Sequence, residues 1–211
     1  DVYKRQSQVG QISPDIGQST DKLHDANSLE ELESMDIILS CQGSAFTENI
    51  HPQLRKTGWK GYWIDAASSL RKSNSSIIIL DPVNLSRIEH AIKIGVKDFV
   101  GGNCTVSLML MAINGLFCEK LVDWVSSMTY QAASGAGASS MEELVKVKQM
   151  FQIGKFTNID FSKLPSAILG LDKQVTQFMN GNEIAKENFG YPLAGNVLPY
   201  IDSELSNGQS R

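Results

Sequence analysis

The residues VGGNCTVS, at positions 100–107, decide how the chain is expected to fold, because a short strand should give way there to a helix. The run from Val96 to Val100 is apolar or compatible with β structure, and Gly101 and Gly102 interrupt it. The apolar positions that follow are too dense for one amphipathic stripe, which predicts a buried helix. Cys104 is therefore expected at the amino end of that helix.

Two interpretations of Cys104 are open at this point. Unpaired N–H groups at a helix amino end, together with the helix dipole, favour the thiolate, which is the nucleophilic form of cysteine. A cysteine on an apolar helix is more often packed in a core, since free cysteine is among the most buried residue types. The neighbouring glycines and Asn103 favour the nucleophile, because they let a backbone or a ligand approach the sulfur closely.

Composition excludes several classes of protein. The 211 residues suffice for one large domain or two small ones. A formal net charge of -4, from 19 basic and 23 acidic residues, gives no electrostatic basis for binding nucleic acid or an anionic membrane. No apolar stretch reaches the ~18 residues of a membrane span and no signal peptide is seen, so a cytoplasmic protein is predicted. Three cysteines without a paired framework or a CxxC motif fit a reducing compartment, and no metal site is expected.

Strands and helices alternate up to about residue 101. A capping box at Ser28 predicts a short helix to Ser34, and Ser86 is expected to cap a later helix that ends at Gly95. A further helix is expected over 45–56, and buried strands over 36–40, 61–66, 77–80 and 96–100. This alternation predicts βαβ units and a parallel sheet, with polar loops at the carboxyl ends of the strands, where ligands bind in such sheets.

The texture changes after the Cys104 helix. Residues 122–133 are rich in β-branched and aromatic residues and partly alternate, which predicts a long strand. Helices are expected over 140–150 and 167–179, with a loop over 154–165 between them and an irregular tail from 188 to 211.

Three features near the predicted strand ends suit covalent acyl chemistry at a thiol. Gln131 could meet Cys104 through tertiary folding, although a glutamine at a strand end is more often a structural hydrogen bonder. Arg71 could bind a phosphate bidentately, although a lone loop arginine is usually solvated, and a guanidinium more than about 15 Å from the sulfur would exclude the role. The small-residue loop 134–138 could cradle a phosphate, but such loops are also common turns.

Several longer runs occur in a characteristic order, namely CQG (41–43), GYWIDAASSLR (61–71), FVGGNCTVS (99–107), TYQAASG (129–135), PLAG (192–195) and the tail 202–211. Together they closely resemble the bacterial-type aspartate-β-semialdehyde dehydrogenase family, and the resemblance covers essentially residues 7–211. It implies an α/β fold with a partial NADP-binding Rossmann domain over 7–102. A partial catalytic and dimerisation domain of the α+β type found in glyceraldehyde-3-phosphate dehydrogenase would follow over 103–211.

The resemblance also implies roles for individual residues. Cys104 would form an acyl thioester and Gln131 would orient the substrate, while Arg71 and Asn103 would hold its phosphate. NADP would be contacted from several loops, by Ser7, Gln42, Ser134, Gly135, Ala136, Gly137, Ala138 and Pro165. Ala136 stands where the family usually has glycine, which is tolerable only if its φ is negative.

The implied activity is NADP-dependent reductive dephosphorylation of β-aspartyl phosphate to aspartate β-semialdehyde, in the biosynthesis of lysine, methionine and threonine, by a homodimer. The family's glycine-rich phosphate loop and catalytic histidine have no counterpart here, and we expect His24, His51 and His90 on the surface. Residues 1–6 join no later pattern and are expected to be a non-native leader. We therefore expect an internal fragment without turnover of its own. The alternatives are a reductase of the N-acetyl-glutamyl-phosphate type and a noncatalytic nucleotide-binding module.

Overall fold

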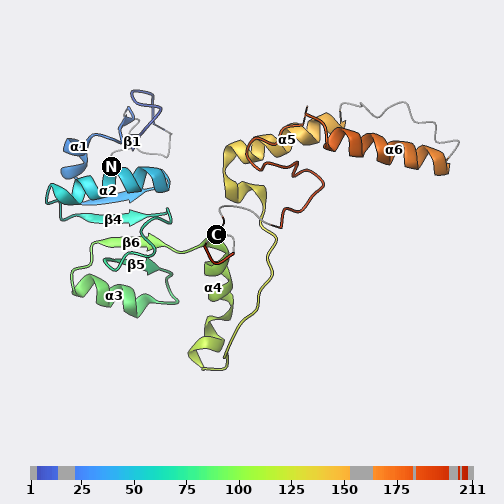
Figure 1. Ribbon diagram of the computed structural model, residues 1–211. Coiled ribbons are helices and arrows are strands. Elements are labelled where there is room, and N and C mark those ends of the chain that lie inside the picture. The colour runs from blue at the N-terminus through green and yellow to red at the C-terminus, as the bar shows by residue number, and fades with distance from the viewer. Residues whose placement is uncertain are drawn as a thin grey trace. The chain divides into compact units, whose positions relative to one another are not determined.

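The chain divides into two compact units, Asp1–Ser127 and Met128–Arg211, and each is described by itself (Figure 1). The computed structural model describes residues 4–13, 22–152, 164–182, 184–199, 204 and 206–208. Within these residues no helix is both long enough and apolar enough to cross a membrane. The domain boundary expected near Asn103 stays a prediction.

The first unit is built on a four-stranded parallel sheet, which confirms the predicted architecture. Its strands are β3 (Ile37–Ser40), β4 (Tyr62–Asp65), β5 (Ser76–Ile79) and β6 (Asp98–Gly101). Their order across the sheet is β3-β4-β6-β5, and every neighbouring pair is parallel. All four lie where short apolar runs predicted them, with ends displaced by at most two residues.

Helix α2 (Ser44–Lys56) covers one face of this sheet and builds the main core. Its buried residues Phe46, Ile50 and Leu54 recur every fourth position and therefore share one helix face. They pack with the buried strand residues Ile38 and Trp63, which pair directly across β3 and β4. The β3–α2–β4 connection thus buries one side of the sheet.

Helix α3 (Leu85–Lys93) connects β5 to β6 and packs beside β5 (Figure 1). The prediction that Ser86 caps this helix is wrong, because the helix begins one residue earlier and Asn84 is its N-cap. The Asn84 side chain accepts from Leu80 N (2.9 Å) and donates to Ile78 O (2.7 Å). These two bonds fix the turn after β5, so the helix starts immediately after Asn84.

The amino-terminal part contains one predicted helix and two strands that were not expected. Ser28 caps the short helix α1 (Leu29–Glu33), as predicted, and its Oγ accepts from Glu31 N at 3.4 Å. The strands β1 (Lys4–Arg5) and β2 (His24–Asp25) pair in parallel and were not predicted. Strands of two residues are too short to leave a pattern in the sequence. Residues 14–21 lie outside the described residues.

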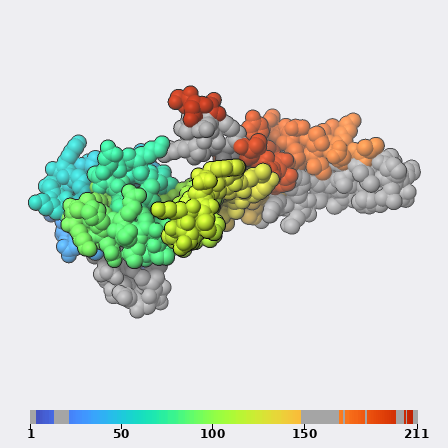
Figure 2. All heavy atoms as spheres, turned by 90° about the horizontal axis from the view of Figure 1, so that it is seen from below, coloured from blue at the N-terminus to red at the C-terminus, as the bar shows by residue number. Residues whose placement is uncertain are grey.

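Helix α4 (Cys104–Cys118) begins at the predicted cysteine but contains no buried residue, so the expectation of a buried helix is wrong. Leu108, for example, is 70% exposed. The strand predicted over 122–133 is also wrong, because no strand is assigned there and Trp124 is 78% exposed. A strand needs a neighbour to pair with, and no described residue pairs with this stretch. The yellow-green atoms of α4 are visible on the face that Figure 2 shows.

The second unit is helical and confirms both predicted helices. The short 3-10 helix η1 (Ala133–Ala136) leads into α5 (Ala138–Gln152), and α6 (Leu164–Met179) follows. A small core joins Val147 to Ile184 and Ala194 of the irregular segment that follows α6. Glu143 pins that segment to α5, since its Oε2 accepts from Asn188 N (2.6 Å) and Asn188 Nδ2 (2.8 Å).

Candidate active site

Three polar loops follow the carboxyl ends of β3, β4 and β6, as the sequence predicted. The connection from β3 to β4 and the connection from β5 to β6 cross the sheet in opposite directions, so the strand order reverses between β4 and β6. In open α/β sheets the ligand cleft lies at the carboxyl edge of such a reversal. The loops after β4 and β6 therefore form the candidate site.

Cys104 stands at this edge as the first residue of α4, which confirms its predicted place at a helix amino end. Asn103 is the N-cap, and its Oδ1 accepts from Val106 N at 3.1 Å. The Cys104 side chain is exposed and free, with only a long 4.0 Å contact to Thr105 Oγ1. A thiol in this place can reach a ligand above the carboxyl edge.

Arg71 joins the loop after β4 to the turn that carries Cys104. Its Nε donates to Gly101 O at 2.8 Å and its Nη2 donates to Gly102 O at 3.0 Å. Gly102 lies two residues before Cys104, so the guanidinium is within about 13 Å of the sulfur by covalent geometry, inside the limit set above. The structure thus brings Arg71, Asn103 and Cys104 together, while the phosphate role of Arg71 stays a prediction.

Asp65 anchors the loop that presents Arg71, and sequence reasoning missed it. Its carboxylate is buried at the end of β4, where Oδ1 accepts from Ala67 N (2.8 Å). The other oxygen, Oδ2, accepts from Thr47 Oγ1 (2.7 Å) and from Trp63 Nε1 (3.2 Å). The signal was an aspartate closing an apolar strand, a position in which a buried carboxylate needs several donors.

Gln42 and Ser7, two of the predicted cofactor contacts, differ in their surroundings. Gln42, in the loop after β3, donates from Nε2 to Lys4 O at 3.3 Å, whereas Ser7 is exposed. Between Gln42 and α2, Gly43 is the N-cap with φ 92 and provides no side-chain cap. The first-turn N–H groups of α2 are therefore left for water or an anion at this edge.

Gln131 and the loop 134–138 come together within the second unit. The Gln131 side chain lies so close over Gly135 that a Cβ there would overlap its Nε2. Ala136 lies in η1 and does not have a positive φ, so the condition for an alanine at this position is met. Gly137 has φ 96 and precedes α5. Gln131 and this loop belong to the second unit, whereas Cys104 belongs to the first.

Pro165 lies in the first turn of α6 rather than in a loop, so the expected loop end is wrong there. Proline is compatible with a first helical turn, because the N–H that it lacks has no intrahelical partner in any case. Residues 153–163 of that expected loop lie outside the described residues. Within the described part of the chain, no three His, Cys, Asp or Glu side chains gather as a metal site would require.

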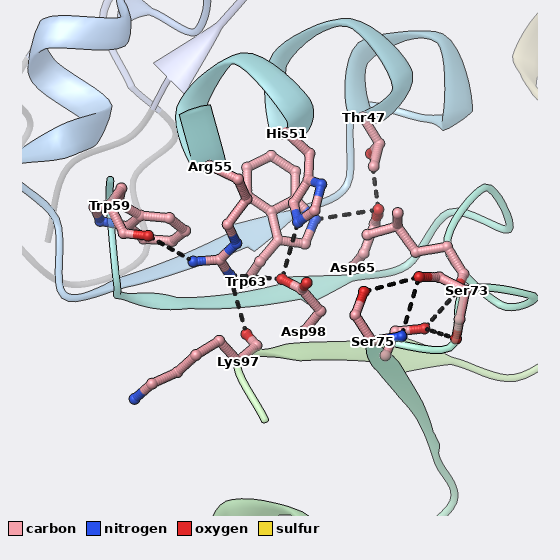
Figure 3. Close-up of polar contacts among 12 residues, drawn as sticks. Thr47, His51, Arg55, Trp59, Trp63, Asp65, Ser73, Ser75, Lys97 and Asp98 are labelled. Carbon is pink, nitrogen blue, oxygen red and sulfur yellow. Dashed lines mark hydrogen bonds and ion pairs between the residues drawn. The ribbon is translucent and has the colours of Figure 1, made fainter. Parts of the chain in front are cut away.

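A second polar cluster lies at the amino end of β6 and corrects the prediction that all three histidines are on the surface (Figure 3). His51 lies on α2 and is buried, and its Nε2 lies 2.9 Å from Asp98 Oδ1. Arg55 Nη2 donates to the same oxygen at 2.5 Å. Burial opposes ionisation of Asp98, but the hydrogen bonds from His51 and Arg55 outweigh it and hold the pKa of this carboxyl below its usual value. The cluster ties α2 to the sheet, at the edge opposite Cys104.

Two family models match most of the chain. The model for the semialdehyde dehydrogenase NAD binding domain matches residues 2–91, and the model for the semialdehyde dehydrogenase dimerisation domain matches residues 113–211. Arg71 lies within the first matched range, whereas Cys104 lies between the two matched ranges.

Solved structures show the same relationship. The aspartate semialdehyde dehydrogenase from Francisella tularensis is 44% identical with a TM-score of 0.90, and the match covers 100% of this chain and 56% of that one. Aspartate semialdehyde dehydrogenase II from Vibrio cholerae shares the fold at 19% identity, with a TM-score of 0.65 and 98% and 52% of the two chains covered, in a complex with ASA. A second structure of the Vibrio protein matches at 18% identity with a TM-score of 0.68. The chain therefore belongs to the semialdehyde dehydrogenase family, with that family's NAD-binding domain followed by its dimerisation domain.

Proposed function

We propose that these residues serve the NADP-dependent reductive dephosphorylation of β-aspartyl phosphate to aspartate β-semialdehyde. The observation that carries the proposal is the placement of an exposed cysteine, Cys104, at the amino end of α4, beside an arginine, at the strand-order reversal of a nucleotide-binding sheet. The 44% identity to the Francisella protein over the whole chain supports the choice of substrate.

The chemistry begins at the Cys104 sulfur. The thiolate attacks the carbonyl carbon of the acyl phosphate, and phosphate leaves with the electron pair of the broken C–O bond, so a thioester forms. Arg71 and Asn103 hold the phosphate, and Gln131 orients the acyl group. NADPH, when bound, supplies the hydride that turns the thioester carbonyl into an aldehyde and returns the thiolate.

The described residues fit the anionic part of a dinucleotide. Gly43 leaves the amino end of α2, a helix of 13 residues, without a side-chain cap at the carboxyl edge of the sheet. Gln42 is adjacent and retains a second N–H and its amide oxygen for a ligand. We assign further cofactor contacts to Ser7, to Pro165 and to the loop of Ser134, Gly135, Ala136, Gly137 and Ala138. A match to a dimerisation domain supports a homodimer.

Two other functions remain as rivals. A reductase of the N-acetyl-glutamyl-phosphate type would use the same thiol chemistry on a longer acyl group. A noncatalytic nucleotide-binding module would be favoured by a buried, enclosed sulfur, but Cys104 is exposed.

The test compares the 211-residue chain with a chain extended by the Francisella residues that lie outside the match. Phosphate-dependent reduction of NADP is followed with aspartate β-semialdehyde and, separately, with N-acetyl-glutamate semialdehyde. We expect turnover of the first substrate by the extended chain and a loss of about 10³-fold or more in its Cys104→Ser variant. Cys118→Ser is the matched control and should keep its turnover. Preference for the second substrate, or an unaffected Cys104→Ser variant, would reject the proposal.

We expect no turnover from the 211 residues alone, because none of their histidines matches the family's base. His51 is engaged with Asp98, and His24 Nδ1 lies 3.0 Å from Glu31 Oε2. A positioned base contributes typically ~10²–10⁴-fold, so its absence alone is enough to suppress the reaction.

A further inference from the structure

The guanidinium of Arg71 is bonded to the backbone of the turn that carries Cys104. Nε and Nη2 donate to two consecutive carbonyls, those of Gly101 and Gly102, at 2.8 and 3.0 Å. We propose that Arg71 is a positioning residue for Cys104, in addition to any contact with phosphate. Its two hydrogen bonds to the Gly101 and Gly102 carbonyls hold the turn that sets the position of Cys104. The proposal deepens the proposed function and rests on it only in taking Cys104 as the nucleophile.

The geometry of a guanidinium lets one side chain bond the turn and bind a phosphate at the same time. The group carries five N–H donors in a fixed plane. Two of them, on Nε and Nη2, point to the turn. The other edge, formed by Nη1 and the second N–H of Nη2, bonds no protein group among the described residues and can bind two oxygens of one anion. A lysine ammonium cannot reproduce two parallel donors on one edge.

The Gly101–Gly102 turn, which Arg71 bonds, is closely packed on its other sides. A Cβ on Gly102 would lie 2.6 Å from Ser107 Oγ and 3.5 Å from Ile78 Cγ2, so the turn rests directly on α4 and β5. Asn103 closes the first turn of α4 twice, because its Oδ1 accepts from Val106 N and its backbone O accepts from Ser107 N at 2.8 Å. A shift of the turn must therefore move the first turn of the helix.

Hydrogen bonds also fix the Arg71 backbone, so the side chain extends from a rigid part of the loop. Arg71 N donates to Ser68 O at 3.1 Å, and the preceding Leu70 O accepts from Ser76 Oγ at 2.5 Å and from Ser73 N at 3.0 Å. Asp65 fixes the start of the same loop through Ala67 N. The loop after β4 and the loop after β6 are thus connected by a side chain that is anchored at both ends.

The test measures Cys104 placement without substrate, so that a wrong substrate assignment does not affect it. Wild-type chain, Arg71→Lys and the matched control Arg87→Lys, an exposed arginine on α3, are alkylated with iodoacetamide at neutral pH. Mass spectrometry gives the Cys104 to Cys118 labelling ratio. We expect this ratio to fall by about threefold or more in Arg71→Lys, because a loosened first turn no longer presents its N–H groups to the sulfur. Arg87→Lys should leave it unchanged.

A second measurement needs no variant and so is independent of any folding defect. In the wild-type chain the Arg71 Nε–H should exchange with solvent more slowly than the Arg87 Nε–H, as seen by side-chain NMR. A labelling ratio that is unchanged or raised in folded Arg71→Lys, or an Arg71 Nε–H that exchanges as fast as that of Arg87, would overturn the proposal.

Discussion

Cys104 and Cys118 are the first and last residues of the same helix, α4. They are about 21 Å apart along the helix axis. The amino end of a helix favours a negative charge and the carboxyl end disfavours it, so the two thiols experience opposite ends of one dipole. Both are free and exposed, which makes them a matched pair within one molecule.

We therefore predict that iodoacetamide labels Cys104 faster than Cys118 or Cys41 in the folded chain. The Cys118 thiol is also engaged within the helix, because Sγ donates to Asn114 Oδ1 at 3.8 Å. Timed labelling followed by peptide mass spectrometry ranks the three sites, and labelling in denaturant gives the reference in which the ranking should disappear. Faster labelling of Cys118 in the folded chain would contradict the prediction.

Asn103 should prove to have two separable roles. Asn103→Ala removes the Oδ1 acceptor of the α4 cap and should cost about 1 kcal/mol of the free energy of unfolding. Asn103→Asp keeps an acceptor for Val106 N, so its stability should stay close to that of the wild type. Neither variant keeps the amide donor, and both should lose any stabilisation by inorganic phosphate. Thermal melts with and without phosphate distinguish the effects, and an equal loss of stability in both variants would argue against the cap.

The Asp98 cluster should make the stability of the first unit depend on acid pH. The folded-state pKa of Asp98 is lowered from its ordinary value of 3.8, so the ionised carboxylate stabilises the fold above that value. This contribution is lost as the pH falls through the lower folded value. Asp98→Asn should cost about 3 kcal/mol near pH 7, because it leaves Arg55 and His51 without a carboxylate, and the difference from the wild type should shrink below about pH 4. Urea melts from about pH 3 to about pH 7 measure the free energy of unfolding of both proteins, and the acid end of this range covers the titration of a carboxyl.

The control for this experiment is Glu31→Gln, since Glu31 also bonds a basic residue and a histidine, Lys4 and His24, but its side chain is 43% exposed against 9% for that of Asp98. The bonds to Lys4 and His24 lower the pKa of Glu31 as well. A carboxylate that stays in contact with water contributes less to stability than a buried one, so we expect a smaller loss than for Asp98→Asn. Equal effects of the two substitutions would show that burial of Asp98 is not what matters.

Gly135→Ala should displace the Gln131 side chain while leaving the fold intact. The new methyl group would overlap Gln131 Nε2, which is the mobile end of an exposed side chain and can move away at little cost. The Gln131 side-chain amide signal in an NMR spectrum should shift strongly. Gly170→Ala in α6 is the matched control, since a Cβ there meets nothing within 4 Å. It should leave Gln131 unchanged and stabilise its helix by about 0.5–1 kcal/mol.

The parallel sheet and the position of Cys104 could be predicted because they depend on local patterns. The apolar runs near Trp63 and Phe99 are short and bounded by glycines, and the Gly101–Gly102 pair marks where β6 ends. The burial of α4 and the strand over 122–133 could not be predicted in the same way. The burial of a helix depends on which surface covers it, and a strand depends on which strand pairs with it. An apolar sequence does not indicate either partner.

The interior role of His51 was missed although a signal was present. His51 lies four residues after Thr47 and four before Arg55, so the three share a helix stripe next to the apolar one. Asp65 and Asp98 stand on the strands that this stripe faces, and each binds it. Polar residues at helical spacing together with carboxylates in apolar strands indicate a buried network, but which pairs form depends on the register between β4 and β6.

Trp63 is fully buried, with its Nε1 bonded to Asp65 and its ring against the edge of His51, whereas Trp124 is largely exposed. The chain therefore carries its own fluorescent label for the α2–sheet interface. Emission from Trp63 should be blue-shifted in the native state and should change when the Asp65 bond is broken, while Trp124 emits at the wavelength of a hydrated indole throughout. In a Trp124→Phe variant the remaining signal comes from Trp59 and Trp63 alone, so that stopped-flow fluorescence can time the docking of α2 onto the sheet without an added dye.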